Sequence, residues 1–205
     1  MGKLFAYDNP IWKITGRAAD IFILTVLWAL FSLPVITIGA STTALYYVTL
    51  KMAEKKEGYL VRTFVKAFKE NFSDSTVIWL IMAAAGGAIG AGIYLNFYSE
   101  SEAGRMLIWF YLVSGIVYLF LLTVIFPLSA RLDTKLGNLF VMAFMVCTQK
   151  FSWVLFMVVM TGCVIAFSVF VFWPVLLFSA GLIALIHSFV LVKAIFPKYH
   201  WNQED

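Results

Sequence analysis

Five apolar stretches occupy most of this chain, and they constrain its fold more than any other feature. One runs from 21 to 50, and the four clearest cover residues 77–94, 106–126, 151–172 and 175–192. A helix that rises about 1.5 Å per residue needs about 20 apolar residues to cross a hydrocarbon core about 30 Å thick. The sequence therefore predicts an all-α fold, a polytopic transmembrane helix bundle with five to six membrane helices.

The composition agrees with a membrane location. The chain is 62% hydrophobic and 13% charged, whereas a soluble domain is about 45–50% apolar and about 25% charged. Its 205 residues make a single integral membrane domain, residues 1–205, with the lipid bilayer as its surroundings. The net charge of +4 is attributed to loops near lipid, and no nucleic-acid partner is expected.

The stretch 21–50 is too long for one straight crossing, and it contains a strong break signal. Pro34 cannot donate a backbone hydrogen bond, so a helix should be interrupted near 32–40. Hydroxyl residues and a glycine follow that could start a new helix, namely Thr37, Gly39, Ser41, Thr42 and Thr43. The alternatives are one kinked span, or two shorter helices that form a hairpin or a re-entrant pair.

Basic residues indicate sidedness, because short loops rich in Lys and Arg stay in the cytoplasm. The N-terminal tail and the patch 51–75 are both basic, so the chain between them should cross twice or re-enter. We expect a multi-pass membrane protein with six helices, both termini inside and a tight external turn at 172–174. A five-span protein with its N-terminus outside is the alternative.

An amphipathic element precedes the first clear span. Phe64, Phe68 and Phe72 recur at i, i+4 and i+8, and the basic residues Arg62, Lys66 and Lys69 face elsewhere. This pattern predicts an interfacial helix on the cytoplasmic side, with rings on one face and cations on the other. A similar element at 140–152 indicates a weak internal repeat of residues 20–97 and 106–172.

The break is the candidate functional site. A helix that starts after Pro34 could aim its positive N-terminal end at an anion or a polar ligand. Alternatively, Thr37 and Ser41 could simply cap a helix at the membrane surface. His187 and Ser188 are the candidate intramembrane polar residues, and the alternatives for the imidazole are a proton relay or a neutral ring bonded to a neighbouring helix.

Small residues mark a candidate packing face in the stretch 77–94. Gly86, Gly90 and Gly92 would let a second helix approach closely. That helix could belong to this chain or to another subunit. In the cytoplasmic connection that follows, Arg131 and Asp133 could pair with each other or with the loop of a partner, and a solvated surface pair is the default expectation.

Signatures of catalysis are missing from the sequence. No nucleophile has both a base and an orienting group, no His, Cys, Asp and Glu cluster has metal-ligand spacing, and no glycine-rich phosphate loop occurs. The chain is therefore expected to be non-enzymatic, with no catalytic residues, no metal and no cofactor.

Three segments, 33–47, 64–72 and 126–132, resemble the YesL-like family of small bacterial membrane proteins of unknown function. The resemblance implies a protein of the bacterial cytoplasmic membrane and a setting among genes for carbohydrate uptake by ABC transporters, and it supplies no catalytic residues. Our first hypothesis is an accessory or assembly protein of such a system, bound to a carbohydrate ABC permease or its regulators. Self-association is the other possible partnership. The alternative is a small transporter or channel whose path is lined by the break at 34–43.

Overall fold

The computed structural model describes residues 10–56, 58–98, 101–170 and 176–199. The expected turn at 172–174 and both chain ends lie outside these residues. Within them the regular elements are all helical, which confirms the predicted all-α class. The helices are α1 (Pro10–Phe31), α2 (Ile38–Ala53), α3 (Leu60–Glu70), α4 (Phe72–Phe97), α5 (Glu102–Arg131), α6 (Leu136–Gln149), α7 (Phe151–Phe170) and α8 (Leu176–Val190). A π-helical turn, Leu191–Ile195, and a 3-10 turn, Phe196–Tyr199, continue α8.

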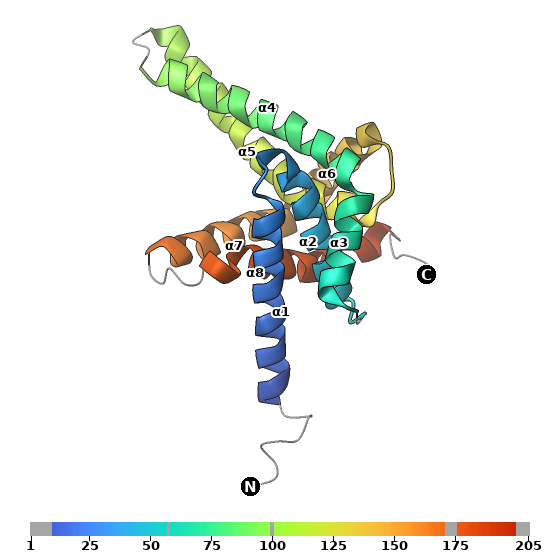
Figure 1. Ribbon diagram of the computed structural model, residues 1–205. Coiled ribbons are helices and arrows are strands. Elements are labelled where there is room, and N and C mark those ends of the chain that lie inside the picture. The colour runs from blue at the N-terminus through green and yellow to red at the C-terminus, as the bar shows by residue number, and fades with distance from the viewer. Residues whose placement is uncertain (1–9, 57, 99–100, 171–175, 200–205) are drawn as a thin grey trace, which may run out of the picture.

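Two long hairpins leave the core, one formed by α4 and α5 and the other by α7 and α8 (Figure 1). Among the described residues, four helices are long and apolar enough to cross a membrane. They are Phe72–Phe97, Glu102–Arg131, Phe151–Phe170 and Phe178–Ile195. These spans confirm that the chain is a helical integral membrane protein.

The predicted break near Pro34 is confirmed. Helix α1 ends at Phe31, a 3-10 turn covers Val35–Thr37, and α2 starts at Ile38. The stretch 21–50 therefore forms two helices rather than one kinked span. Since α2 has 16 residues, it is about 24 Å long, shorter than the hydrocarbon core.

Helix α2 lies across the base of the α4–α5 hairpin (Figure 1). Its first turn contacts α4, because Gly39 lies against the Ser75 carbonyl. Its other end contacts the last turn of α5, because Glu54 pairs with Arg131. Both ends of α2 thus meet the same end of the hairpin, and ten of its residues are buried.

The C-terminal end of α2 carries a backbone strain at Lys55. The Lys55 N–H donates to the Met52 carbonyl at 3.1 Å and the Lys56 N–H to the Lys51 carbonyl at 3.0 Å, the pattern of a Schellman motif. Lys55 has a φ of 60°, which is the left-handed conformation that such motifs normally give to glycine. A lysine therefore holds a position where its Cβ is unfavourable.

Lys55→Gly is expected to stabilise the fold by up to about 1 kcal/mol. Relief of the left-handed strain contributes about 1–2 kcal/mol, and the greater freedom of glycine in the unfolded chain offsets part of that gain. Denaturant unfolding in detergent micelles measures the difference. Lys56→Gly, at a neighbouring exposed position where no left-handed φ is found, serves as the control and should not stabilise the protein.

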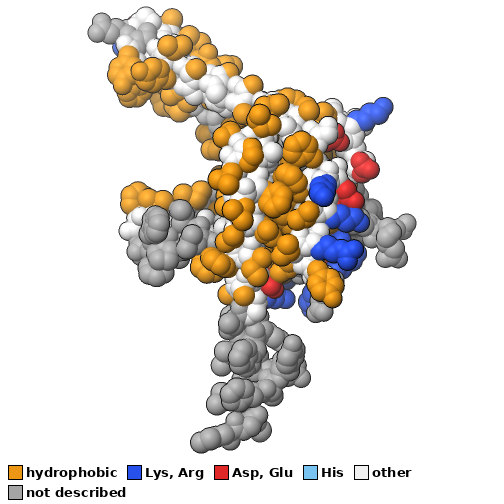
Figure 2. Space-filling view, in the orientation of Figure 1, with side chains coloured by type: hydrophobic (Ala, Val, Ile, Leu, Met, Phe, Trp, Pro, Cys, Tyr) orange, Lys and Arg blue, Asp and Glu red, His pale blue; other side chains and the backbone are white. Residues whose placement is uncertain are grey.

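Charged side chains gather over the core on the side away from the α4–α5 hairpin tip, and hydrophobic side chains cover the hairpin (Figure 2). Exposed apolar residues on the hairpin include Leu80, Tyr94 and Trp109. This distribution is typical of hairpins that lie in lipid and of a core end that meets water.

Helix α3 differs from the predicted interfacial helix in the direction of its aromatic face. Phe64 is fully buried, and the rings of Phe64 and Phe68 pack against Phe31 with centroids 5.5 and 4.8 Å away. Phe72 is partly exposed. The ring face is thus turned mainly into the protein, because it covers the junction between α1 and α2. Amphipathic spacing alone cannot distinguish a protein neighbour from lipid.

The predicted repeat has a counterpart in element order and remains a prediction. Helix α3 leads into α4 across Asn71, and α6 leads into α7 across Lys150. The aromatic faces differ, since Phe64 is buried whereas its counterpart Phe140 is only half-buried and Phe144 is exposed.

Candidate functional site

The break at Pro34 is closed by its own hydroxyl groups. Thr37 Oγ1 lies 2.6 Å from the Phe31 carbonyl and 2.7 Å from the Pro34 carbonyl. Ser41 Oγ lies 2.6 Å from Ser32 Oγ and donates to backbone carbonyls of its own helix. The Phe31 carbonyl at the end of α1 and the Pro34 carbonyl thereby gain partners within the turn.

Other hydroxyl groups of α2 bind neighbouring helices. Trp28 Nε1–H of α1 donates to Thr42 Oγ1 at 3.1 Å, and Ser75 Oγ of α4 donates to Thr43 Oγ1 at 2.8 Å. Thr37 is the N-cap of α2, but its side chain bonds carbonyls and makes no cap hydrogen bond. Thr37 thus holds the N-cap position, but the predicted capping by its hydroxyl group does not occur. The other predicted polar residues of the break, Ser41, Thr42 and Thr43, connect α2 to neighbouring segments.

The tip of the break is apolar and exposed. Leu33, Val35 and Ile36 are 76%, 67% and 58% exposed. They surround the turn whose hydroxyl groups are turned inward. Lipid or another apolar surface suits this tip better than a polar ligand does.

Gly39 is required because there is no room for a side chain, and not because of its backbone conformation. A Cβ at this position would lie 2.3 Å from the Ser75 carbonyl oxygen and 2.5 Å from Trp79 Cβ. Gly39 lies within α2, and no glycine of the described residues has a positive φ. Close approach of α2 to α4 is therefore the reason for glycine here.

His187 lies in a buried polar cluster that joins three helices. Its Nδ1 lies 2.9 Å from the Tyr46 hydroxyl of α2. On the other side, Nε2 lies 3.0 Å from Thr161 Oγ1 and 3.1 Å from the Met157 carbonyl, both of α7. His187 itself is 3% exposed.

The partners of His187 define the position of its proton. The Met157 carbonyl can only accept, and Thr161 Oγ1 already donates to that same carbonyl at 2.9 Å, so Nε2 carries the hydrogen. Nδ1 is then an acceptor, and the Tyr46 hydroxyl donates to it. A neutral imidazole with both nitrogens paired is the arrangement expected for a structural histidine, one of the two alternatives from the sequence.

Tyr46→Phe is expected to destabilise the fold by about 1 kcal/mol, since it leaves His187 Nδ1 buried without its donor. Thermal unfolding in detergent, followed by tryptophan fluorescence, measures the loss. Tyr94→Phe at an exposed position of α4 should leave the unfolding midpoint unchanged. Equal midpoints for Tyr46→Phe and the wild type would show that the cluster does not stabilise the bundle.

Two further polar contacts bind α8 to its neighbours. Ser188 Oγ lies 2.8 Å from Thr49 Oγ1 of α2. The Gly181 N–H donates to Thr25 Oγ1 of α1 at 3.0 Å, at a point where a Cβ on Gly181 would lie 2.7 Å from the Ile21 carbonyl oxygen. Polar pairing and close approach together fix α8 against α1 and α2.

The glycines of α4 only partly form the predicted packing face. A Cβ at Gly86 would lie 2.7 Å from the Tyr118 hydroxyl, and one at Gly92 would lie 2.4 Å from the Tyr111 ring. These two glycines accommodate tyrosines of α5, within the same chain. Gly90 follows Gly86 by four residues but has no neighbour within 4 Å, so α5 does not cover this part of the predicted face.

Arg131 and Glu54 form a buried ion pair at the base of the core. The side chains are 6% and 14% exposed, and the Arg131 guanidinium lies 5.3 Å from the centre of the Phe196 ring. The predicted solvated pair of Arg131 with Asp133 is thus wrong, because α5 presents Arg131 to the end of α2.

Tyr199 of the C-terminal 3-10 turn donates to Gln149 at the end of α6, at 2.9 Å. Burial raises the pKa of this phenol, which keeps it a donor.

The α2 residues that bind His187 and Ser188 were not predicted from the sequence. Tyr46 and Thr49 were overlooked, although Thr42, Tyr46 and Thr49 recur at i, i+4 and i+7 of α2. This spacing predicts one polar stripe on a helix. A polar stripe on a short apolar helix needs polar partners within the protein, so the stripe was a usable signal.

A family model matches the part of the chain that contains the break. Residues 21–93 match a family model described as "Protein of unknown function, DUF624". The matched stretch contains the apolar part of α1, the break, α2, α3 and most of α4. The match thus supports a relationship to an uncharacterised domain family. It includes α1, α2 and α4, the helices that the hydroxyl groups of α2 connect.

No curated protein and no solved structure matches the chain. The YesL-like resemblance therefore stays a prediction. Among the described residues, no group of three or more His, Cys, Asp and Glu residues could hold a metal ion.

Proposed function

We propose that this chain is a non-enzymatic accessory or assembly protein that binds another membrane protein through its α4–α5 hairpin. The observation that carries the proposal is an exposed face of small residues on α4. Its members share helical spacing and exposure: Ala83, Ala84, Gly87, Ala88 and Ala91. Small residues let a second backbone approach closely, which is how helices associate in lipid.

The position of this face supports docking rather than internal packing. Helix α4 uses Gly86 and Gly92 for α5, so the exposed small residues lie on a different face. A Cβ at Gly87 would have no neighbour within 4 Å. The hairpin also projects beyond the core (Figure 1), where a partner helix could lie along it.

The state of the break supports an accessory role over a transport path. Thr37, Ser41, Thr42 and Thr43 all hold partners within the protein. A path would need such groups to face a water-lined space. The partner class follows from the YesL-like resemblance, which implies a carbohydrate ABC permease.

The proposed membrane arrangement has four crossings, made by the α4–α5 and α7–α8 hairpins. Helices α1, α2, α3 and α6 then form a cytoplasmic base at the inner boundary of the membrane, where the exposed apolar tip of the break meets lipid. The basic residues of this base support its cytoplasmic side. The C-terminal turn lies at the base too, because Phe196 contacts Arg131 and Tyr199 contacts Gln149.

Photo-cross-linking in the native membrane tests the proposed function. A photoreactive side chain at position 87 should capture one defined membrane protein, and we expect a carbohydrate ABC permease. The matched control places the same side chain at Ile116, an exposed residue of α5 in the same hairpin, and should capture lipid. Capture of only a second copy from position 87 would contradict the accessory role and favour the small transporter or channel.

A further inference from the structure

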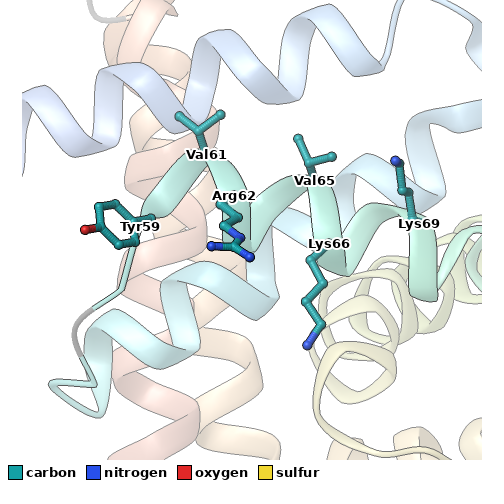
Figure 3. A pocket seen from close by; sticks show the side chains of 6 residues that line it. All are labelled: Tyr59, Val61, Arg62, Val65, Lys66 and Lys69. Carbon is teal, nitrogen blue, oxygen red and sulfur yellow. The ribbon is translucent and has the colours of Figure 1, made fainter.

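The outer face of α3 is the most strongly charged open surface near the predicted membrane boundary. A shallow hollow lies over this face, lined by Tyr59, Val61, Arg62, Val65, Lys66 and Lys69 (Figure 3). The opposite face of α3 is held by Phe64 and Ala67, both fully buried. The helix is therefore fixed to the core, and its outer face is free to bind something else.

The side chains of the outer face form two rows along the helix. Figure 3 shows Val61, Val65 and Lys69 on one side of α3, with Arg62 and Lys66 on the other side. Arg62 and Lys66 are four residues apart, so their Cβ atoms are about 6 Å from each other, close enough for both cations to reach one phosphate group. Tyr59, 83% exposed, flanks the pair with an aromatic ring that suits a membrane interface.

The cations of this face are weakly engaged within the protein. Lys66 lies 3.8 Å from Glu70, but the two side chains are 69% and 55% exposed. An exposed pair of this kind contributes little stability and can exchange for another anion. Lys55 and Lys56, also exposed, precede α3 and add positive charge beside Tyr59.

The outer face of α3 also lies at the boundary between an apolar part and a basic part of the protein surface. Hydrophobic side chains on one side of the core give way to Lys and Arg on the other (Figure 2). Exposed apolar residues of α1, among them Phe22, Ile23 and Leu30, belong to the apolar side. A helix with valines on one edge and cations on the other, at such a boundary, fits the headgroup layer of a bilayer.

We infer that the outer face of α3 binds the headgroups of anionic phospholipids, with Arg62 and Lys66 on the phosphate and Val61 and Val65 toward the acyl chains. Lys69, at the end of the valine row, adds a third cation, because its long side chain can carry the ammonium group to the headgroups. This site is independent of the partner proposed for α4, since it lies on another helix and needs lipid alone. It would fix the depth of the base in the membrane.

Lipid titration of the detergent-solubilised full chain tests the site. Mixed micelles that contain fluorescent phosphatidylglycerol should bind the wild type, and micelles with fluorescent phosphatidylcholine should bind much more weakly. Each basic residue near an anionic surface contributes a factor of about five in affinity. The triple variant R62Q/K66Q/K69Q should therefore bind phosphatidylglycerol up to about a hundredfold more weakly at low salt.

The control is the triple variant K135Q/K150Q/K193Q, which removes the same charge from other elements of the base. It should retain at least a tenth of the wild-type affinity. Equal losses in the two triple variants would show attraction by net charge alone and overturn the site. Unchanged binding in the α3 variant would also overturn it, as would equal binding of the two lipids. Far-UV circular dichroism confirms that both variants remain folded.

Discussion

Gly39→Val is expected to disrupt the bundle, with a loss of about 3 kcal/mol in the free energy of unfolding. The new Cβ would lie 2.3 Å from the Ser75 carbonyl oxygen, and a backbone atom cannot move aside as a flexible side chain could. Separating α2 from α4 would also stretch the hydrogen bond from Ser75 to Thr43, now 2.8 Å. Yield of folded protein and the midpoint of thermal unfolding in detergent report the effect.

Gly87→Val is the matched control for this prediction. Gly87 also lies within a helix, and its added Cβ would have no neighbour within 4 Å. The control should unfold close to the wild type, because the change in helix propensity is small. If Gly39→Val unfolded at the same midpoint as Gly87→Val, the close approach of α2 and α4 would not hold the bundle together.

Arg131→Met is expected to cost about 3–5 kcal/mol, because it leaves the Glu54 carboxylate buried without its main cation. Both side chains are largely buried, so solvent screens the pair only weakly. Loss of the guanidinium also removes its contact with the Phe196 ring. The variant should therefore loosen the last turn of α5, the end of α2 and the C-terminal turn together, which hydrogen exchange would locate.

The double variant Arg131→Met with Glu54→Leu separates the ion pair from packing. Removing both charges avoids the unpaired carboxylate, so the double variant should be more stable than Arg131→Met alone. Arg105→Met, at an exposed position, should change stability little. A double variant as unstable as the single one would mean that Arg131 acts by shape and not by its charge.

Features that depend on local sequence were predictable. Apolar length marked the four long spans, since about 20 residues are needed whatever the neighbours are. Pro34 marked the end of α1 because proline interrupts a helix by its own geometry. Gly39 was expected to matter for either a positive φ or a close approach, and the structure shows the close approach.

Features that depend on contacts far apart in sequence were not predictable. Glu54 and Arg131 lie 77 residues apart, so the nearer Asp133 was the better partner on sequence grounds. The rings of α3 show the same helical spacing whether they face lipid or Phe31. The tyrosines of α5 decide which glycines of α4 are covered, and the spacing of Gly86, Gly90 and Gly92 could not show that Gly90 is left uncovered.

Cysteine accessibility in intact cells tests the proposed membrane arrangement most directly. Single cysteines replace Leu33 at the tip of the break, Lys56 in the base and Glu102 at the tip of the α4–α5 hairpin, in a chain without Cys147 and Cys163. A membrane-impermeant thiol reagent should label the cysteine at 102 from outside, the one at 56 only after permeabilisation, and the one at 33 not from outside. Labelling of the cysteine at 33 from outside would instead show that α1 and α2 cross the membrane as a pair, and it would contradict the four-crossing arrangement with a cytoplasmic base.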